Sequence, residues 1–361
     1  MGQAVGVGEG ARTGVIRVPA EELQRFCLDV LEASQVRQDV AAHVAGGLVQ
    51  ASLRGVDSHG VRLLPHYVRA VKVGRLNPQP AYRFTRTAAA TARLDADHTF
   101  GHAAGMEAVQ KAVGLANEAG VGHVAVYNSS HFGAAAYFAL EIARHNMIGM
   151  ALTNTDALMR SHEGRRAFLG NNPICLAAPC EGEEPFCLDM ATSVLTFNKI
   201  RQLREEGLTA PSGTGANRDG IETTDPHEIT MLLPIGGYKG YGLSMMVEIF
   251  CSLLTGMPYG PHIPKMFEAP LSQRRYLGHA VLAIRIDCFQ DPAVFRKRLA
   301  EMMRELRREP ACEAGTAVQV AGDPEKRMAA QRRREGIPLT LADAGNLKRL
   351  GEECRVRCEW A

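Results

Sequence analysis

The sequence lacks the features that mark nucleic-acid-binding, membrane-spanning and secreted proteins. Its 361 residues include 41 Lys and Arg against 39 Asp and Glu, so no excess of positive charge is available to bind a phosphate backbone. No apolar run reaches the roughly 18 residues that a membrane-spanning helix requires. The first residues lack the basic and then apolar order of a secretory signal. We therefore expect a cytoplasmic protein with neither nucleic acid nor membrane as a partner.

Cysteine is present nine times, but never in a spacing that is typical of metal sites. The closest pairs, Cys175 with Cys180 and Cys354 with Cys358, do not have the two-residue separation that zinc ribbons and redox motifs use. Scattered cysteines in a core-forming chain without a signal peptide are usually reduced and buried. The sequence thus predicts neither a structural metal nor a disulfide framework.

The sequence also lacks both common phosphate-binding motifs. No GxGxxG joins a predicted strand to a predicted helix, since the glycines within residues 1–16 precede any strand, and no GxxxxGK[ST] occurs. A different glycine-rich segment, residues 236–242, leads into a predicted helix at Leu243. Its glycines let backbone N–H groups approach an anion, and Lys239 adds a positive charge. The same glycines could serve turn geometry alone, so both interpretations stay open.

Hydrophobic residues make up 46% of the chain, enough for a large core, and their periodicity predicts an α/β protein with a sheet buried on both faces. Residues 1–16 are Gly-rich and are expected to be flexible. Residues 201–228 are polar and aperiodic, which predicts an exposed loop. Gly120 is expected to end one helix, and Asp291 to cap another. The predicted strands include 121–127, 147–153, 173–178, 185–190 and 280–286, and the predicted helices include 105–119, 134–144, 241–254 and 292–308.

Two histidines lie in segments that suit catalysis. His59 belongs to the sequence Asp57-Ser58-His59-Gly60, and His131 lies between a predicted strand and a predicted helix. Histidine can donate a proton near neutral pH, and a neighbouring carboxylate such as Asp57 can fix its tautomer. Ligands bind at the C-terminal ends of strands in open α/β sheets, which is where His131 falls. A single histidine is more often structural than catalytic, so each is a candidate only.

Seven short segments, in order along the chain, carry a resemblance to a known family. They are Asp57–Gly60 with Tyr67 downstream, Asn128–Gly133, Thr153–Thr155, Leu169–Pro173, Leu188–Ser193, Thr224–Pro226 and Tyr238–Leu243. Over about residues 19–340 the chain resembles the malate/L-lactate dehydrogenase family of the second type. That family includes sulfolactate and ureidoglycolate dehydrogenases, a diketogulonate reductase and piperideine/pyrroline-2-carboxylate reductases. The seven segments together are specific for the family, but not for a substrate.

The resemblance implies a non-Rossmann α/β fold with a large mixed sheet flanked by helices. It also implies a homodimer whose active sites lie between subunits, and NAD or NADP as the cofactor. Residues 126–289 would form the cofactor-binding mixed-sheet domain, and residues 17–125 with about 290–361 a helical part for dimerisation and substrate. The residues implied to bind the cofactor are Thr155, Asp189, Met190, Ala191, Thr192, Lys239, Gly240, Gly322 and Asp323.

The reaction implied by the resemblance is the reduction of a small 2-oxo acid by direct hydride transfer from NAD(P)H. His59 is favoured as the proton donor, with His131 close by. Asp57 or a neighbouring residue would orient the His59 ring.

The resemblance leaves the substrate open. Many relatives carry an arginine where this chain has Leu63, so the substrate carboxylate is assigned to Ser58, Arg62 or Tyr67. One alternative substrate is a cyclic imino acid such as pyrroline-2-carboxylate, which carries the same carboxylate next to the reacting carbon. A second alternative is a non-catalytic relative that keeps the fold for binding, although both histidines and Lys239 argue against it.

Overall fold

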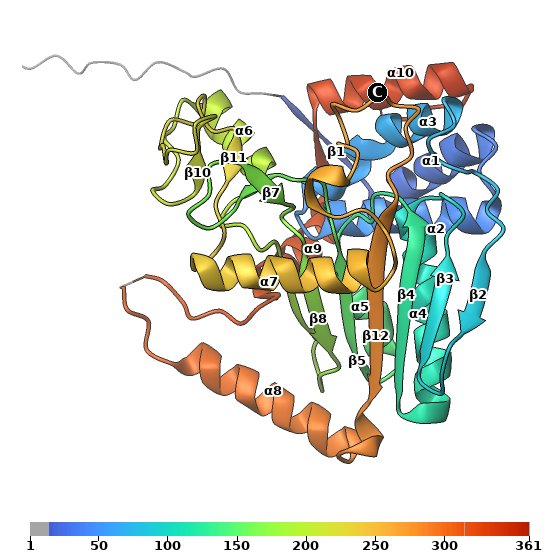
Figure 1. Ribbon diagram of the computed structural model, residues 1–361, viewed down its shortest axis with the longest axis vertical. Helices are drawn as coiled ribbons and strands as arrows, with labels where there is room; N and C mark the ends of the chain where they lie inside the picture. Colours follow the sequence, from blue (N-terminus) through green and yellow to red (C-terminus); the bar gives the residue numbers. More distant parts are fainter. Residues whose placement is uncertain (1–13, 314, 361) are drawn as a thin grey trace, which may run out of the picture.

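The computed structural model describes residues 14–313 and 315–360, and a seven-stranded mixed sheet forms its centre (Figure 1). Of the neighbouring strand pairs in this sheet, only β3 and β4 are parallel. A doubly wound dinucleotide-binding sheet is mostly parallel, so the predicted non-Rossmann mixed sheet is confirmed. The spatial order is β2 (Arg83–Arg86), β3 (Thr91–Asp95), β4 (Val121–Ser129), β12 (Leu277–Arg285), β5 (Met147–Thr153), β8 (Ile174–Ala178) and β9 (Phe186–Met190).

Helices cover both faces of the large sheet. On one face, α4 (Gly101–Ala119) and α5 (Ala136–Arg144) pack on the central strands and form the largest core. Fully buried alanines recur every four residues along α4, at 104, 108, 112 and 116, and this small-residue stripe lets the helix lie close to β4. On the other face, α7 (Tyr238–Glu248) continues into a π-helical turn, η3 (Ile249–Leu253), and crosses the strands (Figure 1). Gly120 ends α4 at φ 82°, as predicted.

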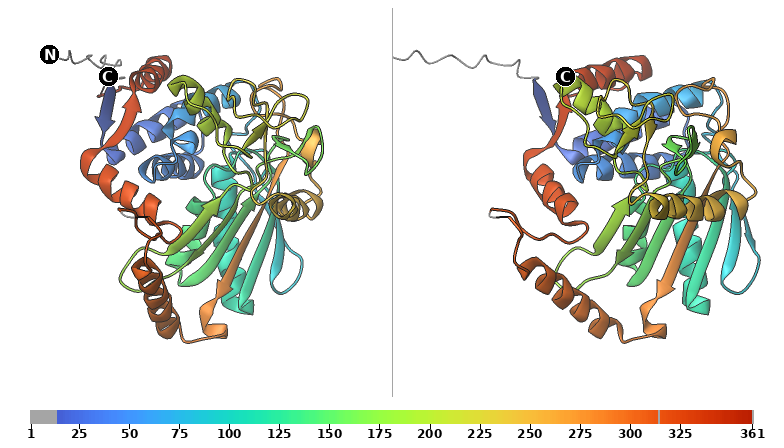
Figure 2. Two further views of the ribbon diagram at one scale, coloured as in Figure 1. Left: turned by 90° about the vertical axis from the view of Figure 1, so that its left-hand side faces the viewer. Right: turned by 60° about the vertical axis from the view of Figure 1, so that its left-hand side comes forward.

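A second layer of helices joins the two ends of the described chain. The apolar stripes of α1 and α2 face each other and share one core with α3 and α10. β1 pairs antiparallel with β13 beside this core, so residues after 320 return to the N-terminal helices (Figure 2). The elements of this layer are β1 (Val15–Val18), α1 (Ala20–Ala33), α2 (Gln38–Leu53), α3 (Leu64–Lys72), α9 (Asp323–Glu335), β13 (Ile337–Thr340) and α10 (Leu341–Cys354).

A small lobe beside the large sheet corrects one prediction. The loop expected at 201–228 begins inside a helix, α6 (Phe197–Glu206), because Ile200 and Leu203 are buried in the lobe's core and Thr196 caps the helix at the backbone N–H of Lys199. The low overall hydrophobicity of α6 concealed this short apolar stripe. The strands of the lobe, in spatial order, are β10 (Gly215–Ala216), β11 (Met231–Leu232), β6 (Met159–Arg160) and β7 (Ala167–Leu169).

The glycine-rich segment before Leu243 is also more helical than expected. α7 begins at Tyr238, so Lys239 and Gly240 belong to its first turn rather than to a loop. A β-carbon on Gly240 would collide with the carbonyl oxygen of Ile235, so this glycine is required for close packing. Close packing therefore explains at least one glycine of this segment.

The remaining elements connect these layers. α8 (Pro292–Arg308) lies along the far end of the sheet (Figure 2), and the carboxylate of Asp291 accepts hydrogen bonds from the N–H groups of Ala293 and Val294, as the predicted cap requires.

Of the segment expected to be flexible, residues 1–13 lie outside the described residues, and Val15 already begins β1. Within the described ranges, no helix is both long and apolar enough to cross a bilayer. The short helical turns are η1 (Asp57–His59), η2 (Val61–Leu63), η4 (Gly260–His262) and η5 (Ile286–Cys288).

Candidate active site

Strand pairing brings distant parts of the sequence to one edge of the large sheet. β4 and β5 both pair antiparallel with β12, so residues that follow β4 and β5 lie beside residues that precede β12. β9 runs parallel to β5, because both are antiparallel to β8, and its C-terminal end reaches the same edge. The C-terminal ends of β4, β5 and β9 therefore meet at one place, where ligand sites of α/β sheets usually form.

His59 and His131 lie against each other at this edge. His131 follows β4, whereas His59 ends the turn η1, which follows α2. The two ring centroids are 5.5 Å apart, and the rings are stacked with 21° between their planes. The structure thus brings together the two imidazoles that the sequence singled out.

Each imidazole is held by a hydroxyl group. Oγ of Ser58 lies 2.8 Å from Nδ1 of His59, and the hydroxyl oxygen of Tyr67 lies 2.6 Å from Nδ1 of His131. These contacts orient the rings and leave Nε2 of each to exchange a proton with a ligand. Tyr67, which was expected to bind substrate, is buried and contacts His131 instead.

The carboxylate of Asp57 does not contact His59. Its two oxygens accept hydrogen bonds from the Arg332 guanidinium at 2.6 and 2.9 Å. Nη1 of Arg332 also donates to the carbonyl oxygen of Ser52, so this arginine of α9 ties α2 to η1. Asp57 therefore fixes the turn that carries His59, and Ser58, the neighbouring residue, orients the ring.

Burial favours the neutral form of both imidazoles, and nearby charged groups add to this effect at His131. Burial lowers the pKa of His59 to about 4. The pKa of His131 is lowered well below its ordinary value, first by burial and then by the nearby imidazoles and the charge of Arg275. Near neutral pH the free protein therefore holds both rings ready to accept a proton.

A wide cleft of about 1130 Å³ opens on one side of the two histidines. Ser58 and Arg62, two of the expected substrate ligands, line it together with His59 and His131. Cationic side chains outnumber acidic ones in its lining, which suits an anionic ligand. The cations include Arg62, Arg165, Arg166, Arg201, Arg218, Lys265 and Arg275, and the acids are Asp156, Glu268 and Glu353.

A second cleft, of about 510 Å³, is also lined by the same two histidines. His59, His131, Thr155 and Asn171 line both clefts, so the two spaces meet there. Small residues and backbone line much of the second cleft, which lets an extended ligand approach the main chain closely. Its lining includes the expected cofactor ligands Thr155, Asp189, Ala191 and Gly322 and the residues Gly133–Ala136, Gln319–Ala321, Pro324 and Glu325.

Of the expected cofactor residues in β9 and the turn after it, Asp189 and Ala191 line the second cleft, whereas Met190 and Thr192 do not. The carboxylate of Asp189 faces the second cleft and accepts a hydrogen bond of 2.8 Å from the N–H of Ala136, in the first turn of α5. Thr192 is fully buried, and its N–H and hydroxyl both donate to the carbonyl oxygen of Asn171. Met190 is half-buried, and neither it nor Thr192 lines the cleft. Thr192 therefore supports Asn171, which does line it.

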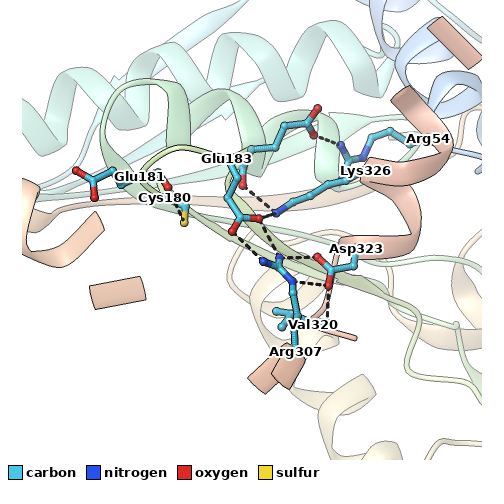
Figure 3. A network of polar contacts seen from close by, with 9 residues as sticks. Arg54, Cys180, Glu181, Glu183, Arg307, Val320, Asp323 and Lys326 are labelled. Atoms are coloured by element: carbon cyan, nitrogen blue, oxygen red, sulfur yellow. Dashed lines mark hydrogen bonds and ion pairs between the residues drawn. The ribbon is translucent and has the colours of Figure 1, made fainter. Parts of the chain in front are cut away.

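Gly322 lines the second cleft, and the residue after it, Asp323, belongs to a network of ion pairs (Figure 3). Gly322 caps α9 with φ 93°, and a β-carbon there would lie 2.9 Å from the carbonyl oxygen of Cys187. The next residue, Asp323, is buried, and its carboxylate binds Arg307 of α8 at 2.7 and 2.9 Å. Arg307 also binds both oxygens of Glu183 at 2.9 Å. Asp323, which was expected to bind the cofactor, is thus engaged in anchoring the Gly322 turn.

Lys239 and Gly240 lie outside both clefts of this chain. Lys239 is exposed at the start of α7, whereas Gly240 is buried against Ile235. Within one chain, therefore, the glycine-rich segment does not converge with the two histidines.

Sequence reasoning missed two residues that line the wide cleft, Arg275 and Asp156. They follow β5 and precede β12, and they form a buried ion pair of 2.5 Å at the edge where the histidines lie. Neither belongs to a motif or to a periodic pattern. The signal that could have found them was the strand order, which single-sequence patterns do not give.

Comparison with known proteins places the chain in a family. The model of the malate/L-lactate dehydrogenase family matches residues 18–348. A malate dehydrogenase of Pyrococcus abyssi is 37% identical over 302 residues, 81% of this chain and 82% of that protein. A Delta(1)-pyrroline-2-carboxylate/Delta(1)-piperideine-2-carboxylate reductase of Pseudomonas putida is 34% identical over 245 residues, 67% and 72% of the two chains. The crystal structure of malate dehydrogenase from Entamoeba histolytica has a TM-score of 0.90 at 29% identity, covering 96% of this chain and 100% of that one. As the sequence motifs predicted, the chain belongs to the malate/L-lactate dehydrogenase family, a family of oxidoreductases.

Proposed function

We propose that this protein is a nicotinamide-dependent dehydrogenase that interconverts a small 2-oxo acid and the corresponding 2-hydroxy acid. The observation that carries the proposal is the junction of the two clefts at His59 and His131. The wide cleft is cationic and suits an acid, so we call it the substrate cleft. The second cleft is lined by small residues and suits a dinucleotide, so we call it the cofactor cleft. The two histidines, which can exchange a proton, lie between them. When bound, NAD or NADP supplies the hydride, and the protein supplies position and the proton.

The residues around the second cleft fit such a cofactor. Gly322 presents backbone where a side chain could not fit, and Thr155 offers a hydroxyl at the junction with the substrate cleft. The hydroxyl of Thr155 donates to the amide oxygen of Asn171 at 3.0 Å, which fixes both side chains there. Fluorescence titration with NADH and with NADPH tests this part, and absence of binding by both would favour a non-catalytic relative.

We assign the proton transfer to His59, with His131 as its stacked neighbour. Ser58 holds Nδ1 of His59, so Nε2 is the atom that would donate to the substrate oxygen in reduction and accept from the hydroxyl in oxidation. Ser58 and Arg62 line the substrate cleft, where they can contact other polar groups of the bound acid.

The lowered pKa of His59 gives the two reaction directions opposite pH profiles. The pKa near 4 leaves little imidazolium in the free protein at neutral pH. We therefore expect kcat/KM for reduction to fall by roughly tenfold per pH unit from about pH 5 to about pH 8, because the protonated form is needed. For oxidation the neutral form is needed, so kcat/KM should stay level over that range. Initial rates in both directions provide the test, and an inflection near the ordinary histidine pKa would contradict the assignment.

A cyclic imino acid is a second candidate substrate, because one relative is named a pyrroline/piperideine-2-carboxylate reductase. An iminium nitrogen binds already protonated, so its reduction needs little help from a general acid. A spectrophotometric panel of 2-oxo acids and cyclic imino acids, with NADH and NADPH, tests the proposed function. Turnover of imino acids alone would replace the first candidate by the second.

We further propose that two copies form a homodimer through the exposed apolar face of α7 and η3. Met245, Ile249 and Leu253, spaced four residues apart, share this face and are between 41% and 60% exposed, which is unusual for large apolar side chains together. Lys239 lies on the same helix, so in such a dimer it would lie close to the other subunit.

The dimer can be tested with two variants. Light scattering should give the mass of two chains for the unaltered protein and of one chain for Leu253→Glu. Lys239→Met should keep the dimer but raise the Kd for NAD(P)H by about tenfold, because a charge-assisted contact is lost. A monomeric unaltered protein with full activity would contradict the shared active site.

A further inference from the structure

Arg275 is a buried arginine with unused hydrogen-bonding capacity. Its side chain is 2% exposed, and Nη2 donates to Asp156 at 2.5 Å. Nε and Nη1 have no hydrogen-bond partner among the described residues. Buried donors are normally paired, and guanidinium groups in particular are rarely enclosed without acceptors for their N–H groups. An acceptor from outside the chain would complete this group.

The position of Arg275 follows from the sheet. It lies two residues before Leu277, which pairs with Ser129 at the end of β4, so Arg275 lies beside the segment that carries His131. Its charge is close enough to add to the lowering of the His131 pKa and to oppose the rise that burial causes in the pKa of Tyr67. It also lines the cleft that His59 and His131 line.

A second buried arginine nearby shows what a structural role looks like. Nη1 of Arg75 donates to the carbonyl oxygen of Met266 at 2.9 Å, and Nη2 donates to that of Pro270 at 3.0 Å. Arg75 thus clamps a loop, and it does not line either cleft. Arg275 has a single carboxylate partner, makes no bond to backbone, and faces the cleft.

We propose that Arg275 is the residue that binds the carboxylate of the substrate. This inference rests on the proposed function. A carboxylate can accept charge-assisted hydrogen bonds from the guanidinium, which are stronger than hydrogen bonds between neutral groups. Held in this way beside His131, the carbon next to the carboxylate lies at the junction of the two clefts. Asp156 positions the guanidinium through its existing bond.

Substitution of Arg275 by glutamine tests the inference. We expect Arg275→Gln to raise the KM for a 2-oxo acid by about 10- to 100-fold, with the Kd for NAD(P)H unchanged. Arg275→Lys should raise the KM less than Arg275→Gln does, because lysine keeps the positive charge although it lacks the fork of donors. Arg274 is the matched control, since it is exposed, directly adjacent, and outside both clefts. Arg274→Gln should change neither constant.

A binding assay keeps the test independent of turnover. Oxamate has the carboxylate and carbonyl of a 2-oxo acid, and calorimetry can measure its binding to the protein saturated with NADH or NADPH. If Arg275→Gln does not fold, the double variant Arg275→Gln with Asp156→Asn removes the unpaired buried carboxylate and serves in its place.

The outcomes separate the two proposals. Turnover by the unaltered protein with an unchanged KM in Arg275→Gln would overturn the role of Arg275 and leave the proposed function. Oxamate binding that depends on Arg275, without turnover of any oxo or imino acid, would overturn the proposed function alone. Failure of the unaltered protein to bind oxamate and to turn over any acid would overturn both.

Discussion

Replacement of His59 by alanine is expected to lower kcat for reduction of the preferred 2-oxo acid by about 10²- to 10⁴-fold. The imidazole lies where the two clefts meet, and Ser58 holds its Nδ1, so the variant removes a positioned proton donor. The Kd for NAD(P)H should stay nearly constant, because His59 is only one of the many residues that line the cofactor cleft and the others are unchanged. Stopped-flow rates and fluorescence titration measure the two quantities separately.

Parallel variants distinguish His59 from its neighbour. His131→Ala should be less severe in reduction than His59→Ala, and the double variant should be little worse than His59→Ala alone, since the stacked rings act as a unit. His145→Ala, at an exposed position after α5, is the control and should behave like the unaltered protein. Full turnover in His59→Ala combined with loss in His131→Ala would transfer the role of donor to His131.

Replacement of Arg307 by methionine is expected to weaken cofactor binding, although Arg307 does not itself line the cofactor cleft. Arg307 holds Glu183 and the buried carboxylate of Asp323, and through Asp323 it fixes Gly322 at the cleft (Figure 3). Its loss leaves Asp323 without a charged partner other than nearby Lys326. We expect the free energy of unfolding to fall by about 2 kcal/mol, less than for a fully buried pair because the Arg307 side chain is 27% exposed. The Kd for NAD(P)H should rise by roughly tenfold, as the binding-competent form becomes less populated.

The matched control for this prediction is Arg308→Met. Arg308 is adjacent, exposed and also in the last turn of α8, so its removal should leave both constants unchanged. Denaturant unfolding and fluorescence titration supply the measurements. If Arg307→Met loses stability while the Kd stays constant, the network supports the fold only and does not position the Gly322 turn.

The histidines could be found from the sequence because each lies in a short motif at the end of an element. His59 follows a helix and His131 follows a strand, and both positions are readable from local pattern. The partner of Asp57 could not be found in this way. Arg332 lies in α9, far along the chain, and only the return of the C-terminal segment to the N-terminal helices brings the two together. Local pattern suggested that Asp57 or a neighbouring residue orients the His59 ring, and the residue in contact with the ring is the neighbour, Ser58.

The same limit explains the remaining differences. The central strands and α8 were predicted closely, because long apolar runs and an Asp cap are strong local signals. α6 was missed because two buried side chains, Ile200 and Leu203, do not make a clear stripe in a polar segment. Arg275 had no signal at all, since its role depends on the antiparallel pairing of β12 with β4 and β5.

The central claim is that one acid and one nicotinamide ring meet at His59 and His131. A crystal structure of the protein with NADH or NADPH and oxamate would test this most directly. We predict the nicotinamide ring at the junction of the two clefts, with oxamate between it and the His59 imidazole and with the oxamate carboxylate on Arg275. A cofactor bound in any other part of the chain, with its ring away from both histidines, would contradict the account.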